Sequence, residues 1–183
     1  MNGVAQKPDA ASTRRKLSLP RWLLLLLSVT VWPLLVILFH GVLPWAISGM
    51  ARRFGWAEQH PGLWNWPGLI FVGLGSIVVL WFWFVHVRKV SAREKVELKS
   101  TPDYLLTDGP YRYSRNPAYL ALLIIWFGWA VFYGSLLVLA GLFFCWVILN
   151  FLVIPREERG LEARHKENYR RYIQRVPRWF SRR

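Results

Sequence analysis

Three long stretches of this chain contain no Asp, Glu, Lys or Arg: residues 22–51, 61–87 and 116–155. A helix needs about 20 consecutive apolar residues to cross roughly 30 Å of hydrocarbon, and each stretch reaches that length. Hydrophobic residues make up 54% of the chain and aromatic residues 16%, more than a soluble domain of this size usually carries. The sequence therefore predicts an all-α integral membrane protein whose helices are surrounded by lipid.

The third uncharged stretch is too long for one crossing. As a single helix it would be roughly 60 Å long, about twice the thickness of the hydrocarbon core. Its one good breaker is Tyr133-Gly134-Ser135, which predicts a helical hairpin at this point. We therefore expect a bundle of four transmembrane helices, at about residues 22–44, 66–87, 117–133 and 135–154.

The basic residues provide an independent test of this topology. With four spans, 22 of the 24 Lys and Arg residues fall on one side of the membrane, whereas three spans would export a tail that carries ten of them. Positive charge concentrates on the cytoplasmic side, so both termini are predicted to be cytoplasmic. The expected location is a bacterial inner membrane, or the endoplasmic reticulum in a eukaryote.

The same patterns divide the chain into three parts. We expect a disordered, basic cytoplasmic arm over residues 1–20, the four-span domain over 21–155, and a cytoplasmic amphipathic tail helix over 156–183. Arg14-Arg15-Lys16 followed by an apolar run also resembles a signal peptide with Ala46-Ile47-Ser48 as its cleavage site, but the run is longer than a signal usually carries. A first span is the preferred interpretation, and cleavage stays open.

The net charge of +14 does not favour nucleic acid as a partner. In a membrane protein, basic loops set the topology and contact anionic membrane lipids, which accounts for the charge. The histidines give no metal site either, because His40, His60, His86 and His165 are scattered and lack the spacing of ligands.

The tail is predicted to be a helix that starts at Pro155, with acidic residues in its first turn. At 100° per residue one stripe forms its buried face. Two carboxylates on that stripe either serve capping and pairing, such as Glu162 with Lys166, or hold a cationic ligand group. The stripe contains Glu158, Leu161, Glu162, His165, Tyr169, Tyr172 and Val176.

The loop before the third span is the second polar segment of interest. Gly109-Pro110 predicts a turn, and Asn116-Pro117 predicts the start of the next helix. Arg115 is thereby expected at a helix N-terminus at the membrane surface, which suits an anion. Alternatively, Arg112 and Arg115 only set the topology by contacting lipid phosphates.

Together these segments resemble the isoprenylcysteine carboxyl methyltransferase and phospholipid methyltransferase family. The resemblance rests on Gly109-Pro110-Tyr111-Arg112-Tyr113-Ser114-Arg115-Asn116-Pro117-Ala118-Tyr119, then a hairpin, then Glu157-Glu158 and Val176-Pro177-Arg178-Trp179. It covers roughly Thr101 to Trp179, less than half of the chain. Two departures stand out: Asn116 replaces the usual His of the isoprenylcysteine branch, and His165-Lys166 replaces a common Phe-Gly pair, which is expected to alter the packing of the tail helix.

The resemblance implies an integral membrane enzyme that uses S-adenosylmethionine and no metal. Glu157 or Glu158 is expected to pair the ammonium group of the cofactor and Arg115 its carboxylate, and tyrosines offer aromatic faces for the adenine or the sulfonium. Arg112, Glu158 and Arg178 are the candidates for a catalytic role, with the arginines orienting an anionic acceptor and Glu158 among the possible bases. The implied cofactor-binding residues are Arg115, Asn116, Pro117, Tyr119, Glu157, Glu158, Tyr169 and Tyr172.

We therefore expect methyl transfer to a lipid-like or prenylated acceptor at the cytoplasmic membrane face. A phospholipid amine, an isoprenylcysteine carboxylate and a thiol all remain possible, because the first two spans carry no decisive motif. The alternatives are an NADPH-dependent reductase similar to the sterol reductases, and a non-catalytic membrane scaffold. Binding of S-adenosylmethionine distinguishes the first alternative from the preferred function.

Overall fold

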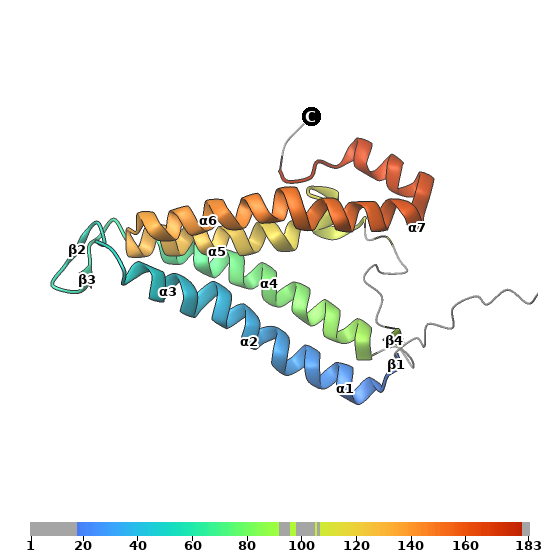
Figure 1. The fold of residues 1–183 in the computed structure, drawn as a ribbon, viewed down its shortest axis with the longest axis horizontal. Coiled ribbons are helices and arrows are strands. Elements are labelled where there is room, and N and C mark those ends of the chain that lie inside the picture. Colours follow the sequence, from blue (N-terminus) through green and yellow to red (C-terminus); the bar gives the residue numbers. More distant parts are fainter. Residues whose placement is uncertain (1–17, 92–95, 98–104, 106, 181–183) are drawn as a thin grey trace, which may run out of the picture.

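The computed structural model describes residues 18–91, 96–97, 105 and 107–180, so residues 1–17 of the predicted arm lie outside the described part. Long apolar helices make up most of the described chain (Figure 1). Two short antiparallel pairs accompany them: β1 (Ser18–Leu19) with β4 (Val96–Glu97), and β2 (Trp56–Ala57) with β3 (His60–Pro61). The predicted all-α class is confirmed.

The first long helix contains two π-helical turns. It runs through α1 (Arg21–Leu26), η1 (Leu27–Val31), α2 (Trp32–Ile37), η2 (Leu38–Val42) and α3 (Leu43–Ser48). Pro44 follows the second π turn and has no N–H to offer the His40 carbonyl four residues earlier. Trp129 Nε1 donates to that carbonyl at 2.6 Å, and Trp126 Nε1 donates to His40 Nδ1 at 2.9 Å. The third apolar helix thus supplies the donors that hold the first helix against it.

The second and third apolar helices, α4 (Pro67–Ser91) and α5 (Pro117–Tyr133), approach most closely at glycines. A Cβ added at Gly128 would lie 2.6 Å from the Gly68 carbonyl oxygen, so only small residues allow this contact. Gly75 makes a similar contact with Ala121, whereas Gly73 faces open space. Close packing of α4 on α5 therefore depends on Gly68 and Gly75 but not on Gly73.

The predicted hairpin turn lies at Gly134. Its φ of 55° is left-handed and ends α5, and Ser135 then caps α6 (Leu136–Ile148) by accepting from Val138 N. Phe54 N donates to Gly134 O at 2.9 Å, which ties the turn to the loop that follows the first long helix. α5 therefore ends at the turn, and its helix covers residues 117–133.

Among the described residues, three helical stretches are long and apolar enough to cross a membrane: Leu27–Ser48, Pro67–Val85 and Leu136–Arg175. The shorter apolar helix Pro117–Tyr133 accompanies them. Large apolar side chains on these helices are exposed, such as Leu34 at 64% and Ile77 at 65%, which suits contact with lipid. The chain is an integral membrane protein. The number of crossings, and which side each end faces, stay predictions.

The tail differs from the straight helix that the sequence predicted. α6 continues without a break through η4 (Leu149–Val153), a π-helical turn, into α7 (Ile154–Arg175). At Lys166, φ is 43° and ψ is −115°, and the chain turns back there along the end of the hairpin (Figure 1). The predicted straight helix is therefore wrong beyond this point, although Tyr169, Tyr172 and Val176 of the predicted face are buried. Glu162 pairs with Arg170 at 3.0 Å across the turn rather than with Lys166.

Candidate functional site

The loop before α5 docks on the C-terminal segment that follows α7. This loop contains the 3-10 turn η3 (Gly109–Arg112), and Arg115 N donates to Pro177 O at 2.9 Å. Ser114 Oγ and Asn116 Nδ2 both donate to Arg178 O, at 3.2 and 3.1 Å. Two motifs about 60 residues apart in the sequence are therefore held together mainly by backbone carbonyl groups.

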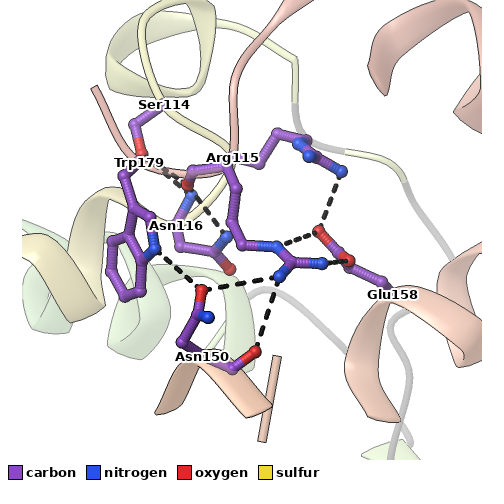
Figure 2. Close-up of polar contacts among 7 residues, drawn as sticks. Ser114, Arg115, Asn116, Asn150, Glu158 and Trp179 are labelled. Atoms are coloured by element: carbon purple, nitrogen blue, oxygen red, sulfur yellow. Dashed lines mark hydrogen bonds and ion pairs between the residues drawn. The ribbon is translucent and has the colours of Figure 1, made fainter. Parts of the chain in front are cut away.

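Glu158 lies between two guanidinium groups at this junction (Figure 2). Its Oε1 is 2.8 Å from Arg115 Nη1, and Arg178 donates to both carboxylate oxygens, from Nε at 3.2 Å and from Nη2 at 2.5 Å. The side chains of Glu158 and Arg115 are each 17% exposed and that of Arg178 is 32% exposed. Such half-buried, bidentate contacts are stronger than ion pairs at the surface.

Asn150 completes the polar cluster and was missed by the sequence analysis. Its Oδ1 accepts from Trp179 Nε1 at 3.1 Å, and Arg178 Nη1 lies 3.5 Å from the same oxygen (Figure 2). Asn150 is the only Asn, Gln or charged residue in the predicted fourth span, and it sits in the π-helical turn η4. Polar residues within spans often mark functional sites, so the sequence did contain a signal for Asn150. The π turn, which also favours functional sites, is visible only in the structure.

Arg115 retains one donor at the centre of the cluster. Its Nε is buried and has no hydrogen-bond partner among the described residues. Tyr169 contacts the same guanidinium. Burial raises the pKa of the Tyr169 hydroxyl and the Glu158 charge adds to this, whereas a hydrogen bond with the Arg115 side chain and the charges of Arg115 and Arg178 oppose it. A buried N–H without a partner is costly, which makes this atom a candidate contact for a ligand.

A second carboxylate lies beside the cluster on the same helix. Tyr119 donates its hydroxyl hydrogen to Glu157 Oε1 at 2.7 Å, and Glu157 is exposed. The two adjacent glutamates therefore differ: Glu158 is bound by two arginines, whereas Glu157 faces water and contacts a tyrosine of α5.

The remaining predicted residues lie in different places. Pro117 is buried at the first position of α5, and Tyr172 is buried and donates to Tyr111 O at 2.8 Å. Arg112 is exposed and lies outside the Glu158 cluster, on a cavity beside Tyr172. The structure thus brings Arg115, Asn116, Glu158 and Arg178 together but leaves Arg112 apart.

No group of three or more His, Cys, Asp or Glu residues capable of holding a metal ion occurs among the described residues. The chemistry available at the junction is that of guanidinium, carboxylate, amide and phenol groups.

A family model described as phospholipid methyltransferase matches residues 63–168, more than half of the chain. The chain belongs to this family. The resemblance seen in the loop and tail motifs is therefore confirmed. Membership of this family supports a membrane methyltransferase. The match includes the loop before α5, the hairpin and Glu157-Glu158, and it ends two residues beyond the turn at Lys166.

One relative among known proteins comes from Haemophilus influenzae and is named only as an uncharacterized protein. It is 39% identical over 61 residues, which cover 33% of this chain and 97% of the relative. No solved structure matches the chain. Of these comparisons the family match alone bears on function, and it suggests a lipid-type substrate.

Proposed function

We propose that this protein transfers a methyl group from S-adenosylmethionine to a lipid-like acceptor at the cytoplasmic face of the membrane. The observation that carries the proposal is the Glu158 cluster, in which the loop before α5, the end of the hairpin and the tail meet. Both halves of the expected cofactor site contribute to it. A merely structural tail would not require the loop arginine to keep a buried, unpaired donor.

The residues present fit the polar end of S-adenosylmethionine. The buried Arg115 Nε suits the carboxylate of the cofactor. Glu158 already accepts from two guanidinium groups, so its main role in this proposal is to hold Arg115 and Arg178 in place. When bound, the cofactor supplies a methyl group that is activated by a sulfonium.

The protein's own task is to align the acceptor, exclude water and accept a proton where the acceptor releases one. A phospholipid amine must lose a proton, whereas a carboxylate does not. Glu157 is the exposed carboxylate nearest the junction along α7, and its contact with Tyr119 fixes one of its oxygens. We therefore place the proton acceptor for an amine at Glu157, with Arg178 available to an anionic part of the acceptor.

The charge distribution supports the cytoplasmic face. The loop before α5 and the tail carry most of the basic residues, which favours the cytoplasm for this end of the hairpin. A water-soluble cofactor then reaches the site from the cytoplasm, while an amphiphilic acceptor reaches it from the bilayer. The family match supports methyl transfer over a reductase or a scaffold.

The test is transfer of a labelled methyl group by the purified full-length protein. The protein is reconstituted with defined lipids and incubated with methyl-labelled S-adenosylmethionine, and the lipids are then separated by class. The proposal expects label in an amine-bearing phospholipid, a prenylated carboxylate or a hydrophobic thiol, with loss of most activity in Arg115→Ala. Absence of label in every class, with bound cofactor demonstrated, would contradict it.

A further inference from the structure

A cavity of about 610 Å³ lies between the loop before α5 and the returning half of α7. The loop wall carries Leu105, Thr107 and Arg112, and the helix wall carries Arg171 and Arg175 among its residues. The two walls are more than 50 residues apart in the sequence and meet only because the chain turns at Lys166. The polar cluster around Glu158 lies elsewhere, since the cavity lining includes none of Arg115, Glu158 and Arg178.

Arginine is the charged residue type in the described lining of the cavity. Its described lining contains three guanidinium groups and no carboxylate. Arg171 shares an exposed ion pair with Glu167 at 3.1 Å, whereas neither Arg112 nor Arg175 makes an ion pair within the described part of the chain. Arg112 and Arg175 line the same cavity without a counterion among the described residues, so an anion that contacts both would stabilise the arrangement.

The cavity lies close to the membrane boundary. Tyr172 and Val176 also line the cavity. Tyr172 donates to the Tyr111 carbonyl oxygen, and just beyond Val176 the side chain of Trp179 donates to Asn150 in the apolar helix. Phe180, just beyond, is 73% exposed. An exposed apolar side chain at this place suits the interface between head groups and acyl chains.

We propose that this cavity binds a phosphate-bearing anion, either the head group of a membrane phospholipid or a free phosphate ester. The planar fork of Arg matches phosphate oxygens, and the volume is sufficient for a phosphate with its glycerol. S-adenosylmethionine has a net positive charge, so three arginines disfavour it here. A bound phosphate would connect the loop to the tail and so hold Arg178 near Glu158.

The test measures binding in the absence of the methyl donor, so its result is independent of the proposed activity. The full-length protein in neutral detergent is titrated by calorimetry with dihexanoyl phosphatidylglycerol, glycerol 3-phosphate and inorganic phosphate. We expect saturable binding of at least one probe, weakened about tenfold or more in Arg175→Gln and in Arg112→Gln. Arg175→Lys, which keeps the charge but loses the fork, is expected to weaken binding less than Arg175→Gln.

Arg156→Gln is the matched control, because it removes the same charge from an exposed position at the start of α7, outside the cavity lining. Its binding should equal that of the wild type. Preference for the lipid identifies a membrane head group as the ligand, and equal binding of glycerol 3-phosphate identifies a free phosphate ester. The proposal is overturned if no probe saturates, if Arg156→Gln weakens binding as much as Arg175→Gln, or if S-adenosylmethionine displaces the probe.

Discussion

Replacing Glu158 with Gln should destabilise the protein far more than the same change at Glu162, one turn further along α7. Glu158 is 17% exposed and holds two guanidinium groups, whereas Glu162 is 44% exposed and its partner Arg170 is 63% exposed. The pair provides a matched comparison, because the substitution and the helix are the same.

The magnitude follows from the burial of the partners. Removing one partner of a fully buried ion pair costs about 3–5 kcal/mol, because a charge is left without compensation. Arg115 and Arg178 are 17% and 32% exposed, so water screens part of that loss, and Gln retains one hydrogen-bond acceptor. We expect a loss of about 2 kcal/mol for Glu158→Gln and at most about 0.5 kcal/mol for Glu162→Gln.

The assay is reversible unfolding of both variants in mixed micelles, with the free energy of unfolding compared with that of the wild type. Arg178→Gln in the Glu158→Gln background should cost little more, since the two residues act as one unit. Equal losses for Glu158→Gln and Glu162→Gln would refute the reasoning, because they would show that the cluster contributes no more than a surface pair.

Two further substitutions test the backbone. Lys166→Gly should raise the free energy of unfolding by about 1 kcal/mol. The change relieves backbone strain of about 1–3 kcal/mol at φ 43° and costs only about 0.5–1 kcal/mol through the greater entropy of glycine in the unfolded chain. A lower free energy of unfolding in the same assay would contradict the turn. Gly134→Ala should lower the free energy of unfolding by at least about 2 kcal/mol, because φ is 55° and the new Cβ would overlap the Phe54 carbonyl oxygen. Gly73→Ala, in open space, is the control that should cost nothing, and equal losses at the two glycines would contradict the packing of the hairpin turn.

The helices of the hairpin were predictable because their signals are local. Uncharged length, the Gly134 turn and Pro117 at the first helical position define α5 without any tertiary information. The meeting of the loop and the tail was expected from the motifs, but its atoms were not, since it depends on backbone carbonyls of Pro177 and Arg178 that carry no sequence signal.

The turn at Lys166 could not be predicted from helical periodicity. Lysine favours helix, and a left-handed φ at a non-glycine residue is imposed by surrounding contacts rather than by local preference. One indirect signal existed. His165-Lys166 replaces a Phe-Gly pair that is common in the family, so Lys166 takes the position of a glycine, the residue that suits a positive φ. A departure expected to change only packing therefore marks the place where the chain reverses.

Calorimetric titration of the full-length protein with S-adenosylmethionine tests the central claim most directly. We expect saturable binding by the wild type and by Glu162→Gln, and at least about tenfold weaker binding by Arg115→Ala and Glu158→Gln in samples whose folded fraction has been measured. A wild-type protein that does not bind the cofactor, or two site variants that bind it as tightly as the wild type, would contradict the account.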